Sequence, residues 1–451
     1  MNKINSFLNN RNNTVYLLIG FSILLVILNI FSKRISFHDA HEYIVVAKSL
    51  AGIHNIKLFT AHSIVYPFII SLFLKVMSSE LIIKFVDTLW IILIGILLLN
   101  FKSKKLILLY IFSPMVYILF PHTTPALPVA FFFLLGYIFI KNYEETRGKL
   151  YFILAGLSLG MCFAIYTPAI ILILFFIFAF FYDKKLGTTI LFLLTMIPTI
   201  AIRFIIDQIY FGFPFYTLIR YMGSNFIVSL GLNQNISFNQ TYHFIYSLPI
   251  LIIGISPLLF LIFKAKFKQY KKEMIFLIPS LIFFIYRGGA EINYIFMVAP
   301  IILLILSEIL TKKQVIISII LSLIITPFLI SDYFGKTSDE ILREDILAIK
   351  NDFNPNQVLA GKNLALVLAA IQYEDSIYIV WPEELKEDPL RSYRFVLDSK
   401  ADVLTSIEFV TNINLNNPQE YKNLLLIERK NQAPGEYKEL KCYQELCVYE
   451  K

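Results

Sequence analysis

The chain has 451 residues, of which 57% are hydrophobic and 16% are charged, and its formal net charge at pH 7 is +8. In soluble domains about a quarter of the residues are charged, so this composition excludes a soluble protein with one globular core. The positive charge does not predict binding to nucleic acid, because the lysine and arginine residues collect in short loops, as the orientation of a membrane protein requires.

Continuous apolar runs follow one another from residue 15 to residue 331. A helix needs about 20 apolar residues to cross the hydrocarbon layer, and the runs do not alternate with polar residues, which favours helices over a barrel. The first run lacks a small-residue cleavage site and predicts a retained span. We therefore predict a polytopic α-helical membrane protein with about eleven transmembrane helices. The predicted spans are 15–32, 81–101, 106–121, 125–141, 150–166, 169–182, 188–205, 244–263, 274–287, 294–310 and 314–331.

The apolar segment 66–77 is short and predicts an interfacial or re-entrant helix rather than a span. With the N-terminus in the cytoplasm, the tight basic loops then all lie on the inner side of the cell membrane, as the positive-inside rule requires. A full span at 66–77 would place the later basic loops outside. We therefore expect three large outer segments, which are Lys33–Glu80, Arg203–His243 and the tail after Ser331.

The composition changes at Asp332, where the chain becomes more charged. We therefore divide the chain into a transmembrane domain, 1–331, and a soluble extracytoplasmic domain, 332–451. In the second domain we predict an amphipathic helix in SDEILREDILAIKND, strands in QVLAG, DSIYIVW and YKNLLLIER, a helix in KNLALVLAAIQ and a hairpin in LKCYQELCVYEK. Alternating strands and helices indicate a small α/β domain. The spacing of Cys442 and Cys447 fits either a disulfide or two free thiols.

Asp39 and Glu42 lie near the start of the first outer loop, 33–80, and their spacing of three places them on one face of a helix. Two carboxylates at a membrane surface suit general-base chemistry. The same spacing also fits a capping box, in which both acids satisfy N–H groups at a helix start, and the two interpretations are compatible. The neighbouring histidines match no zinc signature, so the pattern predicts no cofactor and leaves a divalent metal open.

The sequence HDAHEYIVVAKSLAG, followed by HSIVYPFIISLFLKVMSSELIIKFVDTL, resembles the start of the C-type glycosyltransferases, the GT-C superfamily. Three later pieces agree with that family in order, namely AGLSLGMCFAIYTPAIILI, IYFGFPFYT and GGAEINYIFMVAPIILLI. The resemblance covers roughly residues 15 to 331. It implies a polytopic enzyme that uses polyprenyl-phosphate sugars, and the pieces are most similar to mannosyltransferases and related hexosyltransferases.

The resemblance also implies roles for single residues. Asp39 would be the general base that activates the acceptor hydroxyl, and Glu42 would be a second candidate or a partner that positions Asp39. Glu291 and Tyr294 stand where the family has its late acidic motif. This chain departs from the motif at Asn293, where the family has an arginine.

The phosphate of the donor needs a cation, and three arginines of the predicted outer face can supply one. Arg287 lies four residues before Glu291, Arg203 begins the second outer segment, and Arg220 lies within that segment. A guanidinium can grip phosphate through two hydrogen bonds. The plainer alternatives are helix-end side chains that reach water, and a salt bridge between Arg287 and Glu291.

The implied function is the transfer of a hexose, mannose or glucose, from a polyprenyl- or dolichyl-phosphate donor to a lipid-linked glycan or protein acceptor, with inversion at the anomeric carbon. Two alternatives stay open, which are a lipid or glycan transporter or flippase, and a non-catalytic scaffold of a glycan-assembly complex. Transporters place ionisable residues along their spans. Here Lys84 and Asp87 lie in the early part of one span, and Asp207 and Glu308 lie near the ends of others.

Overall fold

A computed structural model describes the chain at residues 11–32, 38–53, 60–229, 253–264, 269–288, 292–335, 338–354, 357–361, 364, 367–368, 376–380, 425–431 and 437–450. The chain forms two compact units. Unit 1 consists of Met1–Ser32, Lys84–Arg203 and Ser237–Ser331, and unit 2 consists of Lys33–Ile83, Phe204–Ile236 and Asp332–Lys451.

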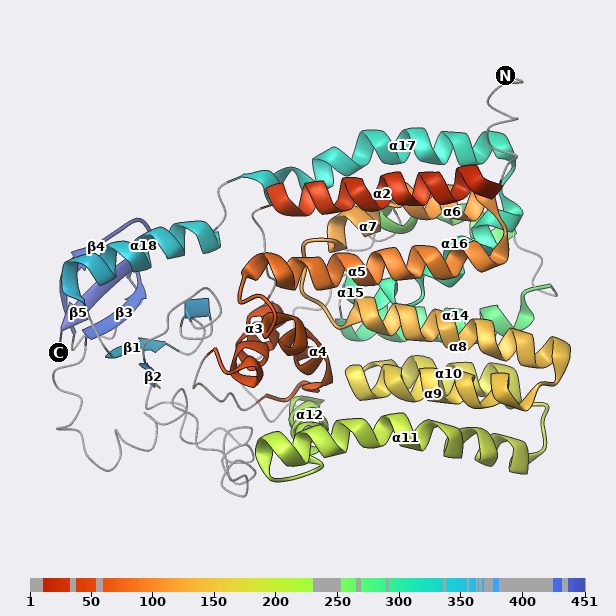
Figure 1. Ribbon diagram of the computed structural model, residues 1–451, viewed down its shortest axis with the longest axis horizontal. Helices are drawn as coiled ribbons and strands as arrows, with labels where there is room; N and C mark the ends of the chain where they lie inside the picture. Colours follow the sequence, from red (N-terminus) through yellow and green to blue (C-terminus); the bar gives the residue numbers. More distant parts are fainter. Residues whose placement is uncertain are drawn as a thin grey trace. The chain divides into compact units, whose positions relative to one another are not determined.

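Long apolar helices make up unit 1 (Figure 1). The helices that lie in it or enter it are α2 (Arg11–Phe31), α5 (Glu80–Leu98), η1 (Leu99–Phe101), α6 (Lys104–Ile111), α7 (Pro114–Leu119), α8 (Ala126–Thr146), α9 (Lys149–Ile165), α10 (Ala169–Phe181), α11 (Leu186–Phe211), η2 (Leu259–Lys264), α14 (Lys271–Gly288), α15 (Ile292–Phe296), α16 (Ala299–Ile309) and α17 (Lys312–Ile330). Among the described residues, 5 helices are long and apolar enough to cross a membrane, and they belong to α2, α5, α8, α11 and α17. The prediction of a polytopic helical membrane protein is therefore confirmed.

Each predicted span coincides with a helix or a pair of helices, except 244–263, whose first part, 244–252, lies outside the described residues and whose end overlaps η2. Two spans are interrupted. The span 106–121 consists of α6 and α7, because Pro114 lacks an N–H group and begins the second helix. The span 294–310 consists of α15 and α16, and Pro300 stands in the first turn of α16. A hydropathy pattern does not reveal such breaks, because both halves of each span are equally apolar.

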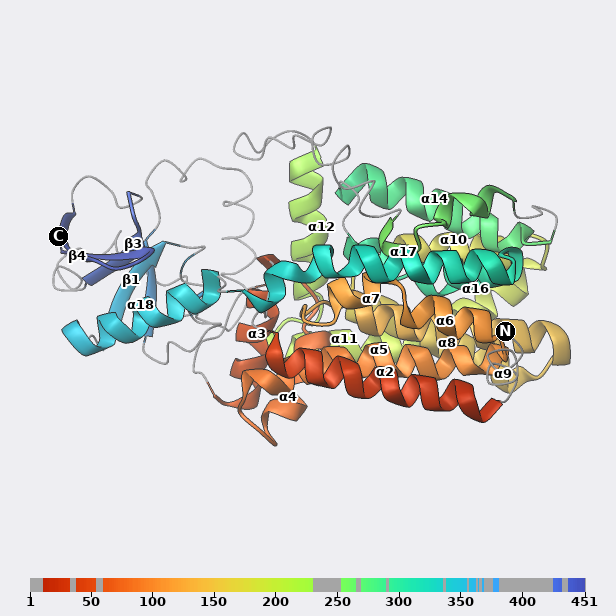
Figure 2. The same ribbon diagram turned by 90° about the horizontal axis from the view of Figure 1, so that it is seen from above.

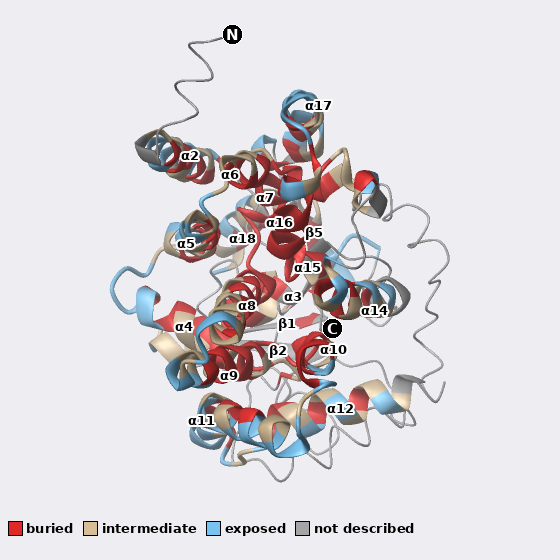
Figure 3. Ribbon diagram, turned by 90° about the vertical axis from the view of Figure 1, so that its right-hand side faces the viewer, coloured by how far each residue is buried: buried red, intermediate tan, exposed pale blue. Residues whose placement is uncertain are grey.

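The helices of unit 1 differ in how much of their surface is buried (Figure 3). In the spanning window of α8, 56% of the residues are buried, but in α2, α11 and α17 only 22% are. On α17 the exposed side chains include Ile316, Ile320 and Leu323. Exposing apolar surface to water costs about 25 cal/mol per Å², so a row of exposed apolar side chains is more stable in contact with lipid than with water. We infer that α8 belongs to the protein core and that α2, α11 and α17 face the bilayer.

The helices α9 and α11 approach closely at two glycines of α9. A Cβ atom at Gly160 would lie only 2.5 Å from the carbonyl oxygen of Met196, and Gly156 faces α11 one turn earlier with similarly little room. The Thr199 hydroxyl donates a hydrogen bond of 3.0 Å to the carbonyl of Leu157 across this contact. Small residues four apart let spanning helices approach in this way.

Charged residues tie α8 to α14 at the C-terminal end of α8. Glu273 is buried, and its Oε1 lies 2.7 Å from Nζ of Lys141 and accepts a hydrogen bond of 2.8 Å from the Tyr137 hydroxyl. A second ion pair joins Lys272 to Glu144. A buried carboxylate is costly without such partners, so this network favours one register of the two helices.

Unit 2 contains the short helices α3 (His38–Ala51), α4 (Val65–Leu74), α12 (Tyr216–Ser229) and η3 (Ser331–Phe334). With 10 residues, α4 is about 15 Å long, half of what a span requires. The segment predicted at 66–77 is therefore a short helix, and its interfacial or re-entrant position in the membrane stays a prediction. The helices α3 and α4 pack against each other, and the residue directly after α3 is Gly52, whose φ of +77° suits a glycine.

The tail of unit 2 is an α/β structure (Figure 2). Helix α18 (Ser338–Phe353) precedes a 5-stranded sheet in the order β2-β1-β3-β5-β4. The strands are β1 (Gln357–Gly361), β2 (Ser376–Val380), β3 (Leu425–Arg429), β4 (Lys438–Cys442) and β5 (Leu446–Glu450). Strand β1 pairs in parallel with β2 and β3, and β5 pairs antiparallel with β3 and β4. The amphipathic helix, the strands and the hairpin are as predicted, whereas most of the predicted helix in KNLALVLAAIQ lies outside the described residues.

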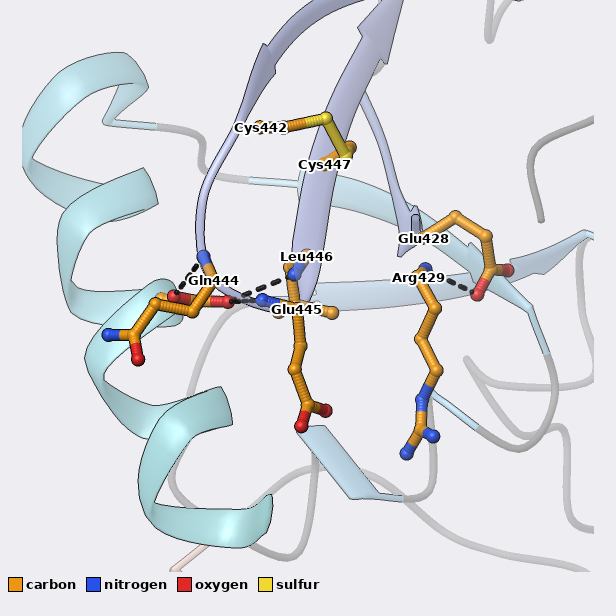
Figure 4. Close-up of a disulfide and its surroundings, with 8 residues drawn as sticks. Glu428, Arg429, Cys442, Gln444, Glu445, Leu446 and Cys447 are labelled. Atoms are coloured by element: carbon orange, nitrogen blue, oxygen red, sulfur yellow. Dashed lines mark hydrogen bonds between the residues drawn. A yellow bond between two sulfur atoms is a disulfide. The ribbon is translucent and has the colours of Figure 1, made fainter. Parts of the chain in front are cut away.

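Hairpin β4–β5 is held in two ways (Figure 4). Cys442 and Cys447 face each other in the ladder and form a disulfide, which settles the two alternatives for these cysteines. Asp345 of α18 is buried, and its carboxylate accepts hydrogen bonds from the backbone N–H groups of Gln444, Glu445 and Leu446, at 3.1, 2.7 and 2.9 Å. The turn is therefore fixed to α18 by one side chain.

Candidate functional site

Asp39 lies in the first turn of α3, where an acidic side chain is favoured by the free N–H groups of the helix. Its side chain lies outside the part of the structure that is described, and so does Glu291. Arg287 lies near the end of α14, and its side chain is likewise outside the described part. The roles of these three residues stay predictions.

Glu42 lies one turn further along α3 and has an imidazole as its neighbour. Its Oε2 lies 4.0 Å from Nε2 of His62, and the side chains of both residues are about 20% exposed. The ring of Tyr43 meets the rings of His62 and Tyr66 edge-on, at 5.4 and 5.7 Å between centroids, and Tyr221 of α12 lies 6.4 Å from His62. Tyr43 of α3 and Tyr221 of α12 therefore both lie beside His62, and Tyr66 of α4 joins this cluster through Tyr43. A carboxylate beside an imidazole can hold and relay a proton.

Arg220 lies on α12 and is almost fully buried. It donates a hydrogen bond to the hydroxyl of Tyr216, and its guanidinium carbon lies 5.7 Å from the centre of that ring. The corner before α12 is fixed by Asp207, whose Oδ2 accepts hydrogen bonds from the N–H and hydroxyl of Thr217, at 3.0 and 2.7 Å. The ring of Phe211 stacks on Tyr216 at 4.0 Å. The corner thus holds Arg220 in one orientation.

Arg203 of α11 is fully buried, so it does not reach water as a helix-end side chain would. Its Nη1 donates hydrogen bonds to the hydroxyl of Thr167, at 2.8 Å, and to the carbonyl of Phe163, at 3.5 Å. Its guanidinium carbon also lies 5.5 Å from the centre of the Phe163 ring. Desolvating a guanidinium is costly, so a buried arginine of this kind indicates a structural or ligand-binding role.

Tyr294 of α15 lies between two aromatic rings. It stacks on Tyr166, at 6.0 Å and 20° between planes, and on Phe284 of α14, at 5.4 Å and 13°. Tyr166 is directly followed by Thr167, the partner of Arg203. Three pieces of the chain that are far apart in sequence, the Tyr-Thr-Pro turn, the end of the seventh predicted span and the late motif, therefore meet in unit 1.

Two features of the structure are not evident from the sequence. His62 is one of several histidines near the acidic motif, and its proximity to Glu42 depends on how the chain folds back beside α3. The second feature is the turn between α7 and α8, residues 121–125 with the sequence PHTTP, where His122, Thr123 and Thr124 are all buried. Three polar residues between prolines in a short turn between apolar runs were a signal that could have been read.

The described residues contain one group of side chains that lie close enough to share a metal ion, which is Glu439 with Cys442 and Cys447. Because the two cysteines form a disulfide, they offer no thiolate to a cation.

No protein-family model and no curated protein sequence matches the chain. Solved structures do. ArnT from Cupriavidus metallidurans bound to undecaprenyl phosphate is similar with a TM-score of 0.64 and 11% identity, over 96% of this chain and 97% of that one. The same protein in the apo state gives a TM-score of 0.60 at 10% identity, over the same shares of both chains. The oligosaccharyltransferase of Archaeoglobus fulgidus, in complex with Zn and sulfate, gives 0.51 at 12% identity, over 92% of this chain and 68% of that one. The likeness extends over nearly the whole length, so the chain has the GT-C fold that its sequence motifs predicted.

Proposed function

We propose that the chain is a multi-pass membrane glycosyltransferase that moves a hexose, mannose or glucose, from polyprenyl or dolichyl phosphate to a lipid-linked glycan or protein acceptor on the outer face. The observation that carries this proposal is the likeness over 96% of the chain to a protein bound to undecaprenyl phosphate. A polyprenyl phosphate is what a polyprenyl-phosphate sugar releases when its sugar is transferred. The meeting of two of the family-like pieces at Tyr166 and Tyr294, with Arg203 bonded to the neighbouring Thr167, supports it further.

The orientation we propose has the N-terminus in the cytoplasm and the tail outside. The segments predicted to lie outside are 33–80, 203–243 and the tail, and nearly the same segments gather in one compact unit, unit 2. At the C-terminal end of α8, which this orientation places inside, Lys141 and Lys272 lie in ion pairs. Lysines at that end of a span agree with the positive-inside rule.

The chemistry we propose is a direct displacement. The acceptor hydroxyl gives its proton to the carboxylate of Asp39 while its oxygen bonds to the anomeric carbon of the sugar. The bond from that carbon to the phosphate oxygen breaks, and polyprenyl phosphate leaves with the electron pair. Attack opposite to the leaving group inverts the anomeric centre. Glu42, paired with His62, is the second carboxylate of the same helix and orients Asp39 or shares its proton.

A cation must stabilise the charge that develops on the leaving phosphate. Arg203, Arg220 and Arg287 are the candidates. Arg203 and Arg220 are both buried and held by aromatic neighbours, which favours a fixed guanidinium over a mobile one. Fixed donors need no reorganisation during the reaction, and this is the property that lowers the barrier.

The test is a transfer assay in membranes with radiolabelled polyprenyl-phosphate mannose or glucose. Replacing Asp39 with Asn should abolish transfer in a protein that remains folded and membrane-bound, and retained activity would rule out Asp39 as the base. Label that enters sealed vesicles without forming a new glycoside would favour the transporter. A wild-type protein that neither transfers nor transports would favour the scaffold.

A further inference from the structure

The turn that joins α7 to α8, residues 121–125, buries an unusual amount of polar side chain for its length. His122, Thr123 and Thr124 are 1%, 3% and 5% exposed. Part of this polarity serves the turn itself, since the Thr124 hydroxyl accepts a hydrogen bond of 3.3 Å from the N–H of Ala126. The N–H of His122 likewise bonds to the carbonyl of Leu119 at 3.0 Å. These contacts form the turn and start α8.

The Thr123 hydroxyl, unlike that of Thr124, takes no part in the hydrogen bonds that form the turn. Within the described part of the chain, its Oγ1 is buried and has no hydrogen-bond partner. Most buried hydroxyls in proteins are bonded, because a buried polar group without a partner destabilises the fold. A valine would fill the same space without that penalty. The hydroxyl therefore indicates a partner beyond the described residues, and a ligand or an ordered water would supply it.

The position of the turn within unit 1 favours a ligand. The turn between α7 and α8, the turn between α9 and α10, and helix α15 lie at the same end of the unit-1 helices (Figure 1). Helix α15, which carries Tyr294, packs against both α7 and α8. The turn between α9 and α10 carries Thr167, the partner of Arg203. The 121–125 turn thus shares its end of the unit with the buried guanidinium.

We propose that the 121–125 turn is a sugar subsite, in which Thr123 and His122 bind hydroxyl groups of the donor's hexose. This inference rests on the proposed function and assigns it a specificity element. A phosphate only accepts hydrogen bonds and needs a cation, whereas sugar hydroxyls both donate and accept. A threonine hydroxyl also does both, and so does an imidazole in its neutral form. The turn therefore suits the uncharged part of the donor, and the arginines suit its phosphate.

The experiment compares two lipids, polyprenyl phosphate and polyprenyl-phosphate mannose or glucose, for binding to the full-length protein in lipid nanodiscs. Replacing Thr123 with Val should weaken binding of the sugar-bearing lipid about tenfold and leave binding of polyprenyl phosphate unchanged. Replacing Thr123 with Ser, which keeps the hydroxyl, should restore binding. The matched control is Thr14→Val, which makes the same change at a buried threonine near the start of α2. A donor lacking one sugar hydroxyl should be insensitive to Thr123→Val if that hydroxyl is the partner.

Three results would overturn the subsite. In the first, Thr123→Val weakens the binding of both lipids equally. In the second, Thr123→Val changes the binding of neither lipid, as expected if the partner of Thr123 is an ordered water only. In the third, the wild-type protein binds both lipids equally. These results are separate from the fate of the proposed function. A wild-type protein that binds the sugar-bearing lipid more tightly but transfers no sugar contradicts the transferase and keeps the subsite. A wild-type protein that transfers sugar, together with a Thr123→Val variant whose binding of both lipids is unchanged, supports the transferase and contradicts the subsite.

Discussion

The carboxylate of Glu42 and the imidazole of His62 lie 4.0 Å apart, so the second carboxylate of the predicted acidic motif has a neighbour that can carry a proton. We expect Glu42→Gln to lower kcat/KM for transfer about tenfold or more, since it removes the charge and keeps the shape. His62→Gln should lower kcat/KM by a smaller factor. Because the two side chains are neighbours, the double variant should lose less than the product of the two single losses.

Kinetics of the four proteins in the membrane assay measure this coupling. Glu145→Gln is the control, because Glu145 is exposed near the C-terminal end of α8 and belongs to neither the acidic motif nor the His62 cluster. Losses that multiply independently would contradict a functional pair.

Donor binding and transfer should depend on the planar guanidinium of Arg203 and not on its charge alone. Arg203→Lys keeps the charge but not the planar fork that reaches Thr167, so we expect a rise in the donor KM and an overall loss of about tenfold or more in kcat/KM. Thr167→Val should have a smaller effect in the same direction. The control is Arg147→Lys, at an exposed arginine after α8. Normal donor kinetics in a folded Arg203→Lys protein would remove Arg203 from the phosphate site.

Gly160 should be required for the packing of α9 on α11. The Cβ atom of Gly160→Ala would lie 2.5 Å from the Met196 carbonyl oxygen, so the two helices must separate. Overpacking of this kind costs about 1–3 kcal/mol. We expect a lower thermal midpoint in detergent, measured by aggregation or thiol reactivity of Cys162. Gly20→Ala in α2, where nothing lies within 4 Å, should leave the midpoint unchanged, and equal effects of both variants would contradict the packing argument.

Asp345 should be the main fastening of the β4–β5 hairpin to α18. Asp345→Ala leaves three backbone N–H groups without their acceptor, and each buried unsatisfied group costs about 1–3 kcal/mol. We expect faster hydrogen exchange in residues 443–446 of the full-length protein. Glu344→Gln is the matched change on the same helix, because Glu344 makes one exposed hydrogen bond, of 2.9 Å, to Gln444. Unchanged exchange in Asp345→Ala would show that the disulfide alone holds the turn.

The contact of Asp352 with β4 should depend on pH. Hydrogen bonds from Lys441 and Tyr443, both of 2.5 Å, lower the pKa of the Asp352 carboxyl in the folded protein. A folded pKa below the unfolded one means that its contribution to stability is present above the unfolded pKa of about 4 and is lost as the pH falls further. Asp352→Asn should therefore lower the protease resistance of the tail at neutral pH, and the difference from wild type should shrink in acid. A constant difference would contradict this linkage.

Local features were predictable from the sequence. The spans, the short helix at 66–77 and the strands of the tail follow from runs of apolar residues and from where they end, and these are properties of neighbouring residues. The contacts of the candidate site are long-range and could not be predicted in this way. The stacking of Tyr294 on Tyr166 and the bond from Arg203 to Thr167 join residues that the chain separates widely, and they depend on how the helices pack. The burial of His122 and Thr123 likewise depends on tertiary packing, and the helices that flank their turn, α7 and α8, both pack against α15.

The disulfide between Cys442 and Cys447 has a practical consequence. The chain has 3 cysteines, and the remaining one, Cys162, is buried. The natural protein therefore presents no accessible thiol to a maleimide reagent. A single cysteine introduced at an exposed position becomes its one reactive handle, so membrane-impermeant labels can map each loop to one side of the bilayer without removing any native residue.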